Sequence, residues 1–302
     1  MSKVHCVVLA ESPQMRVRFT EVVAQHAPGV MLVDPDTATP EAVTLALTWR
    51  PPAGMFARFP GLQAVCGVGA GIDNILACPD LPADLPVVRV LDPMQGRAMA
   101  EYVLFHVLWH HRRFGDFLTR QREARWRRTI APPASEVTVG ILGLGRIGQE
   151  VEATLQGLGY RVAGWRRADG AAGLDAVLAQ ADILVNLLPL TPETRGILDA
   201  RLFARARHGA YLIQIGRGEH LVEADLLAAL DTGRLSGAAL DVFTTEPLPR
   251  DHPFWGHPGI VATPHIAGEA APAEVARTLA RTAAEIAQGL PLSGAIDRRR
   301  GY

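Results

Sequence analysis

The stretch Val137-Thr-Val-Gly-Ile-Leu142 runs directly into Gly143-Leu-Gly-Arg-Ile-Gly148 and decides the fold of this 302-residue chain. Its first half is apolar and β-branched, which predicts a buried strand. The glycines that follow have the spacing G-x-G-x-x-G, a helix-like segment comes next, and a second strand is expected at Arg161–Trp165. Gly143 permits a tight turn, Gly145 lets the backbone approach a pyrophosphate, and Gly148 lets the helix pack closely on the strand. This context predicts a dinucleotide-binding unit rather than a plain glycine-rich turn.

Outward from this unit, apolar runs alternate with segments of helical periodicity, a pattern typical of parallel α/β proteins. Other strands are expected at Val4–Leu9, Val43–Thr48, Leu62–Cys66, Val87–Val90, Asp182–Leu188, Ala210–Ile215, Gly237–Asp241 and Ile260–Ala262. The clearest helices are Pro13–His26, Arg97–Arg113 and Pro272–Gln288, and Gly289 suits the C-terminal cap of the last one. Residues 114–136 are rich in arginine and proline, which predicts an extended arm or loop.

The length corresponds to about two domains. We expect two doubly wound parallel-sheet α/β domains with a cleft between them. Residues 1–95 plus 272–302 would form a flavodoxin-like substrate domain, and residues 96–271 a Rossmann NAD(P)-binding domain.

The composition excludes several classes of protein. A formal net charge of −1 argues against a nucleic-acid partner, which requires a strongly basic face. Cys6, Cys66 and Cys78 are too few for a disulfide framework, and Cys6 and Cys66, which lie in strand-like runs, are expected to be reduced core residues of a cytoplasmic protein. No apolar run approaches the ~18 residues of a membrane span, and the first residues enter a strand without a signal-peptide pattern. No metal site is expected.

Three residues suited to the reduction of a 2-keto acid follow expected strands, where α/β proteins carry their chemistry. Arg217 offers a rigid fork for a substrate carboxylate and would polarise the neighbouring carbonyl. His265 would donate the proton, and Glu246 would orient the imidazole and favour its protonated form. Considered singly, Arg217 could be a surface charge, Glu246 part of a Glu-Pro turn, and His265 a structural histidine. Their joint occurrence after expected strands favours a catalytic site.

The end of the strand Arg161–Trp165 distinguishes the cofactors. An NAD site places an acidic residue there for the ribose 2′-hydroxyl, but this chain has Arg166 and Arg167, and its first acid is Asp169. Two guanidinium groups attract a 2′-phosphate, although they would also suit a solvated surface. We therefore expect NADP(H) to be preferred, with NAD(H) possible.

Seven motifs in fixed order resemble the D-isomer-specific 2-hydroxyacid dehydrogenases. They are Val68-Gly-Ala-Gly-Ile-Asp-Asn74, Gly143–Gly148, Leu187-Leu-Pro-Leu-Thr-Pro-Glu-Thr194, Gly216-Arg-Gly218, Leu240-Asp-Val-Phe243, Glu246-Pro247 and Thr263-Pro-His265. Within the family, Thr48-Trp-Arg-Pro-Pro52, Trp165-Arg-Arg167 and the ending Asp297–Tyr302 are most similar to the bacterial glyoxylate/hydroxypyruvate reductases of type A. The family usually has asparagine where this chain has Gln214, and its close relatives more often carry a small polar residue where this chain has Arg166.

The resemblance implies that Arg217, Glu246 and His265 are catalytic and that Asp241 faces the nicotinamide carboxamide. The expected cofactor contacts are Gly143, Gly145, Arg146, Ile147, Gly148, Trp165, Arg166, Arg167, Leu188, Pro189, Thr194, Ile215, Gly216, Arg217, Asp241, His265 and Gly268. The resemblance also implies a homodimer. Residues 97–135, with Trp126 among arginines, would form its arm, and Tyr302 would lie near the interface.

The substrate is expected to contact Trp49, Val68, Gly69, Arg217 and His265. The backbone N–H groups of Val68 and Gly69 can form a small anion-binding nest, although a plain glycine turn would have the same sequence. Trp49 would restrict the pocket to short side chains, or else pack as a core aromatic residue. The predicted reaction is hydride transfer from NADPH to glyoxylate or hydroxypyruvate. The alternatives are a D-2-hydroxyacid dehydrogenase with another substrate specificity and a dinucleotide-sensing binding protein.

Overall fold

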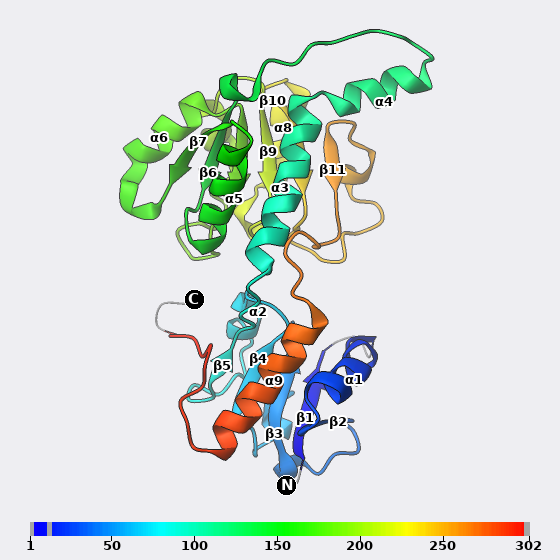
Figure 1. The fold of residues 1–302 in the computed structure, drawn as a ribbon, viewed down its shortest axis with the longest axis vertical. Coiled ribbons are helices and arrows are strands. Elements are labelled where there is room, and N and C mark those ends of the chain that lie inside the picture. Colours follow the sequence, from blue (N-terminus) through cyan, green and yellow to red (C-terminus); the bar gives the residue numbers. More distant parts are fainter. Residues whose placement is uncertain (1–2, 11–13, 299–302) are drawn as a thin grey trace. The chain divides into compact units, whose positions relative to one another are not determined.

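The computed structural model describes residues 3–10 and 14–298. The chain divides into two compact units, each built on its own sheet (Figure 1). The first unit comprises Met1–Pro93 and Ala270–Tyr302, and the second comprises Met94–Glu269.

The first unit contains a five-stranded parallel sheet in the order β2-β1-β3-β4-β5. Its elements are β1 (Val4–Leu9), α1 (Gln14–His26), β2 (Val30–Val33), β3 (Val43–Thr48), β4 (Ala64–Gly67), α2 (Asp73–Leu76), β5 (Val87–Val88) and α9 (Pro272–Ala287). Successive residues of a strand point to opposite faces. Cys6 and Val8 therefore pack beneath α1 and α9, whereas Val7 and Leu9 pack against Phe56 and the residues around α2.

The second unit contains a six-stranded parallel sheet in the order β11-β10-β9-β8-β6-β7. Its helices are α3 (Gln95–His111), α4 (Phe114–Arg122), α5 (Arg146–Gly157), α6 (Gly170–Gln180), α7 (Ala200–Arg205) and α8 (Glu223–Asp231). Its strands are β6 (Thr138–Leu142), β7 (Arg161–Trp165), β8 (Ile183–Asn186), β9 (Ala210–Gln214), β10 (Leu235–Leu240) and β11 (Ile260–Ala262). The order turns back at β6, so the carboxyl ends of β6 and β8 form the position at which such sheets bind ligands.

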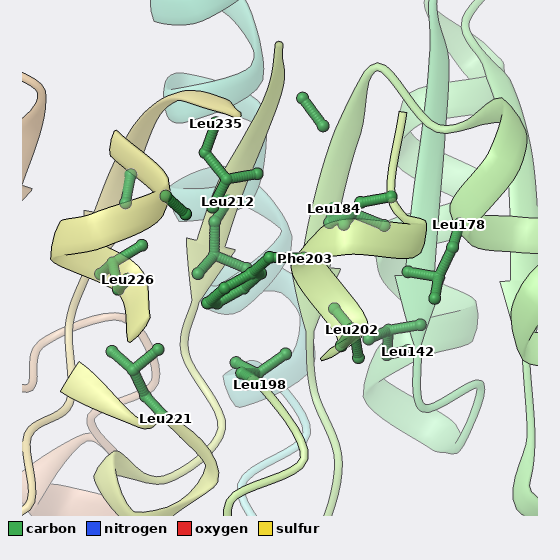
Figure 2. Packing of buried hydrophobic residues seen from close by; sticks show 14 of the residues in the cluster. Leu142, Leu178, Leu184, Leu198, Leu202, Phe203, Leu212, Leu221, Leu226 and Leu235 are labelled. Atoms are coloured by element: carbon green, nitrogen blue, oxygen red, sulfur yellow. The ribbon is translucent and has the colours of Figure 1, made fainter. Parts of the chain in front are cut away.

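Both faces of the second sheet are covered. Side chains of α3 and α5, such as Val103 and Val151, pack with Ile141 on one face. On the other face α6, α7 and α8 enclose a leucine-rich core, in which Phe203 lies among Leu202, Leu212 and neighbouring leucines (Figure 2). The predicted fold class, two doubly wound parallel-sheet units, is confirmed.

Most predicted elements are present, with ends that coincide or are shifted by one or two residues, but two local differences have physical causes. The prediction of an extended arm or loop for residues 114–136 was wrong for its first residues, which form α4. None of the side chains of α4 is buried, although Phe114, Phe117 and Leu118 have the i, i+3, i+4 spacing of a helix face, and ion pairs from Asp116 to Arg113 and Arg120 support the helix. The strand β2 was missed because it is a short edge strand of four residues.

Several smaller expectations can be compared with the structure. All three cysteines are free and buried. Gly289 follows α9 with φ +64°, the left-handed conformation expected of a cap. Pro13 and Tyr302 lie outside the described residues. Within the described part of the chain, no helix is long and apolar enough to cross a membrane, and no cluster of three or more histidine, cysteine or acidic side chains could hold a metal ion.

Candidate active site

The three predicted catalytic residues all lie in the second unit, in loops that leave adjacent strands. Arg217 follows β9, Glu246 lies beyond β10, and His265 lies just beyond β11. Parallel strands end at the same edge of a sheet, so the three loops share the edge at which doubly wound sheets bind ligands.

The side chains of His265 and Glu246 form a hydrogen-bonded pair. The distance from His265 Nδ1 to Glu246 Oε2 is 2.9 Å, and Glu246 Oε1 accepts the backbone N–H of Phe243 at 3.0 Å. Because an ionised carboxylate can only accept, the imidazole donates through Nδ1. Its Nε2 is then the ring nitrogen suited to proton transfer. The His265 side chain is 28% exposed, so the ring remains accessible.

The loop that carries His265 is held in an unusual conformation. His265 has φ +57°, a left-handed value that non-glycine residues rarely adopt, and its N–H bonds to the carbonyl of Thr263. Such a conformation persists only where the surroundings enforce it. The geometry of this loop therefore requires specific support.

Asp241 supplies that support. Its Oδ1 accepts the Thr263 hydroxyl at 2.6 Å and the Ile266 N–H at 2.9 Å, and its Oδ2 accepts the Ala267 N–H at 2.8 Å. The Tyr102 hydroxyl lies 2.6 Å from Thr263 Oγ1 and extends the chain of hydrogen bonds into α3. Burial raises the pKa of Asp241, and these hydrogen bonds partly offset the rise. Thr263 and Tyr102 were not among the predicted site residues, although Thr263 stands in the motif that ends at His265.

Arg217 lies in a loop that only glycine neighbours permit. Its Nη1 donates to the carbonyl of Gly216 at 2.8 Å. A Cβ atom at Gly218 would lie 1.9 Å from the carbonyl carbon of Phe243. The arginine loop therefore packs directly on the segment between β10 and Glu246, which brings these two parts of the predicted site together.

The glycine-rich turn after β6 has the geometry of a phosphate-binding loop. Gly143 has φ +109°, and a Cβ at Gly148 would lie 2.2 Å from the carbonyl oxygen of Gly143. A Cβ at Gly145, in contrast, would meet no atom within 4 Å, so the space beside its backbone is open to a ligand. The first turn of α5 has no acidic residue, and among the described residues no side chain caps it. The unpaired N–H groups of this helix end suit the phosphates of a dinucleotide.

Arg166 and Arg167 follow β7 and are exposed. The Asp169 carboxylate accepts the backbone N–H of Arg166 at 2.7 Å, so this acid is engaged within its own turn. Arg167 Nη1 lies 3.5 Å from Glu193 Oε2, an exposed pair that contributes little to stability. Both arginines are therefore placed where a 2′-phosphate could be bound.

The remaining expected cofactor positions lie at or beyond the carboxyl ends of β6, β7, β8, β9 and β11. The Thr194 hydroxyl donates to the carbonyl of Pro189 at 2.7 Å, so it also shapes the loop after β8. Leu188 and Ile215 are buried, and the side chain of Trp165 donates to the carbonyl of Gly170 at 2.9 Å. Arg146 and Ile147 form the first turn of α5, and the carbonyl of Gly268 accepts the Gln95 side-chain amide.

The predicted substrate contacts of the first unit lie together at the ends of β3 and β4. A Cβ at Gly69 would lie 3.9 Å from Cζ3 of Trp49, so the indole lies beside the Gly69 loop. The carbonyl of Gly69 accepts the Val90 N–H at 3.1 Å, which fixes the Gly69 loop to the segment that follows β5.

Comparison with known proteins gives the family. Residues 104–267 match the D-isomer specific 2-hydroxyacid dehydrogenase NAD binding domain. A glyoxylate/hydroxypyruvate reductase A of Klebsiella pneumoniae is 39% identical over 293 residues, covering 92% of this chain and 94% of the relative. A glyoxylate/hydroxypyruvate reductase A of Salmonella newport is 41% identical over 272 residues, covering 85% of this chain and 87% of the relative.

Comparison with solved structures points to the same family. A D-isomer specific 2-hydroxyacid dehydrogenase family protein of Klebsiella pneumoniae has a TM-score of 0.92 at 39% identity and covers 99% of each chain. An NADPH-dependent glyoxylate/hydroxypyruvate reductase of Sinorhizobium meliloti, solved with NADP and sulfate, has a TM-score of 0.90 at 36% identity and covers 99% of this chain and 100% of its own. With the Rossmann-type unit and the match across both units, this chain belongs to the D-isomer specific 2-hydroxyacid dehydrogenases, a family of oxidoreductases.

Proposed function

We propose that this chain reduces glyoxylate to glycolate and hydroxypyruvate to D-glycerate with NADPH. The observation that carries the proposal is the His265–Glu246 pair, which lies at the same sheet edge as Arg217 and the phosphate-binding turn. Similarity to relatives named glyoxylate/hydroxypyruvate reductase supports the choice of substrate. The substrate assignment is tested by measuring kcat/KM for glyoxylate, hydroxypyruvate, pyruvate and a branched keto acid. An advantage of more than about tenfold for pyruvate or the branched acid would refute the substrate assignment.

In the proposed mechanism Arg217 binds the keto-acid carboxylate through two parallel N–H donors and polarises the adjacent carbonyl. A reduced nicotinamide dinucleotide held by the Gly143–Gly148 turn would supply the hydride for the carbonyl carbon. His265 donates the Nε2 proton to the carbonyl oxygen, which completes the hydroxyl group, and then regains a proton from water. Glu246 keeps Nδ1–H fixed throughout and stabilises the positive charge that His265 carries before the transfer.

We also propose that the backbone amides of Val68 and Gly69 bind the substrate carboxylate, and that Trp49 limits the size of the substrate side chain. The contact between the Trp49 ring and the Gly69 loop supports this assignment. The first unit would then serve as the substrate domain and the second as the cofactor domain. The family's match to an NAD binding domain within the second unit supports that division.

The cofactor proposal makes a direct prediction. Arg166→Ala and Arg167→Ala should each raise the Kd of NADPH about tenfold or more, because a charge-assisted hydrogen bond to phosphate contributes roughly 1.5–3 kcal/mol. The Kd of NADH should stay within about twofold, since NADH carries no 2′-phosphate. Fluorescence titration measures both constants, and Arg201→Ala, an exposed arginine of α7, is the matched control. Equal affinity of the unsubstituted protein for both cofactors would contradict the assignment.

We propose a homodimer formed through residues 97–135. Exposed apolar side chains on α3, α4 and the following segment support it, and the Trp126 side chain is 98% exposed. Phe105→Glu together with Leu118→Glu should convert the dimer to a monomer, because both side chains are exposed on this surface. Sedimentation measures the mass, and Val17→Glu, at an exposed position of α1, should leave the dimer intact. A monomeric unsubstituted protein would contradict the proposal.

We further propose that the protein acts in the cytoplasm on a small-molecule substrate, without a nucleic-acid partner. The three free, buried cysteines and the near-neutral charge support this. Cell fractionation tests the location, and recovery of the protein outside the cytoplasmic fraction would contradict it.

A further inference from the structure

Three polar side chains that the proposed reaction does not use lie buried against the Arg217 loop. Asn186 ends β8, Gln214 ends β9, and His220 belongs to the short turn Gly218–His220. Each is 0% exposed. Polar groups buried so completely are costly unless they are hydrogen-bonded, so the bonds that they make are informative. We call this group the arginine platform.

The platform holds both backbone polar groups of Arg217. The N–H of Arg217 donates to His220 Nδ1 at 3.1 Å, and Gln214 Nε2 donates to the carbonyl oxygen of Arg217 at 2.7 Å. A peptide N–H can only donate, so His220 Nδ1 is the acceptor. The neutral imidazole of His220 therefore carries its proton on Nε2. That Nε2 lies 3.3 Å from the carbonyl oxygen of Pro189, to which it donates. His220 therefore joins the arginine loop to the loop that is expected to line the nicotinamide.

Asn186 fixes the orientation of its two partners. Its Nδ2 donates to Gln214 Oε1 at 2.7 Å and lies 3.0 Å from His220 Nδ1, while its Oδ1 accepts the Leu188 N–H at 3.3 Å. Gln214 Oε1 also accepts the N–H of Gly216 at 3.2 Å. Each amide can satisfy these bonds in one orientation only, so the side chains of the platform hold one another in place.

The platform is itself anchored in the core. The Leu198 N–H donates to the carbonyl of His220 at 2.9 Å, and Leu221 pairs with Leu198 in an isolated parallel bridge. Leu198 and Leu221 also lie in the leucine-rich core (Figure 2). A Cβ at Gly216 would lie 2.9 Å from both Asn186 Nδ2 and His220 Nδ1, so the arginine loop rests directly on the platform. The position of Arg217 is thus set by a rigid support.

We infer that His220 and Gln214 are positioning residues that place the Arg217 guanidinium for the keto-acid carboxylate. An anion clamp must be held within a fraction of an ångström of its productive position, because small displacements of binding groups cost large factors in rate. The inference rests on the proposed function of Arg217. It goes further in assigning separate tasks to the nitrogens of His220: Nδ1 positions Arg217, and Nε2 holds the Pro189 loop.

Two substitutions separate these tasks. His220→Asn can place an acceptor near the Nδ1 position and keep the Arg217 bond, but it cannot reach Pro189. His220→Gln can place a donor near the Nε2 position and keep the Pro189 bond, but it leaves the Arg217 N–H without its acceptor. His220→Gln should therefore raise the KM for glyoxylate about tenfold or more with the NADPH Kd within about threefold. His220→Asn should show the reverse pattern, with the larger change in the NADPH Kd.

The experiment measures KM, kcat, the NADPH Kd and the melting temperature of both variants, and it determines their crystal structures. Equal losses in both variants that follow the melting temperature would show a purely structural role and overturn the inference. An Arg217 backbone that keeps its position in crystals of His220→Gln would overturn it as well, whichever substrate the enzyme uses. Absence of glyoxylate reduction by the unsubstituted protein would instead refute the proposed function. The two failures are therefore distinguishable.

Discussion

Arg217→Ala should lower kcat/KM for glyoxylate reduction by about 10³-fold, because it removes both the carboxylate clamp and the group that polarises the carbonyl. Arg217→Lys should recover only part of this loss, since an ammonium retains the charge but lacks the planar fork. The NADPH Kd should change by no more than a few-fold in either variant, because the backbone of the loop is held by Gln214 and His220. Steady-state kinetics and cofactor titration measure the two effects.

The control for this prediction is Arg201→Ala, which removes an exposed arginine of the same unit outside the site. Its kcat/KM should stay within about twofold of the unsubstituted value, as expected for an ordinary surface substitution. If Arg217→Ala retained more than about a tenth of the activity, Arg217 would not be the main carboxylate-binding group.

His265→Asn should lower kcat by about 10²–10⁴-fold, the usual contribution of general acid catalysis. Asparagine is chosen because it tolerates the left-handed backbone observed at this position, so the loop held by Asp241 should be preserved. Unchanged melting temperature and NADPH Kd would confirm that the fold and the cofactor site are intact. Kinetics at saturating glyoxylate measure the loss.

Glu246→Gln tests the second member of the pair. Glutamine keeps the size of the side chain, but it cannot supply the negative charge that stabilises a protonated His265. A fall in kcat of about 10–100-fold, smaller than that of His265→Asn, is expected. If His265→Asn retained nearly full kcat, another group would have to donate the proton, and the proposed mechanism would be wrong.

The fold and the grouping of the three candidate catalytic residues could be predicted because they depend on local patterns. A run such as Val137–Leu142 followed by three spaced glycines specifies a strand, a turn and a helix within 12 residues. The carboxyl ends of parallel strands meet at one edge, so Arg217, Glu246 and His265 could be grouped without coordinates. The structure confirms the α/β class, and the hydrogen bond between His265 and Glu246 is as predicted.

Other features depend on tertiary contacts and left no pattern in the sequence. Nothing near His220 distinguishes it from a surface histidine, because its partners come from the ends of β8 and β9. Tyr102 lies in a long helix far from Thr263 in the chain, and Asp241 gave no sign that it also holds the His265 loop. The helix α4 was missed although Phe114, Phe117 and Leu118 have helical spacing, because the many arginines and prolines of residues 114–136 were interpreted as an extended arm.

The measurement that tests the central claim most directly follows the hydrogen atom itself. The unsubstituted protein is incubated with glyoxylate and NADPH that carries deuterium in both C4 positions, and the product is analysed by mass spectrometry. We predict glycolate with a single deuterium on its hydroxyl-bearing carbon, formed in equal amount to the NADP⁺ released, and at an initial rate about a hundredth or less of this with His265→Asn. NADPH that stays unconsumed, or glycolate without deuterium, would contradict the proposal that this enzyme reduces glyoxylate by direct hydride transfer.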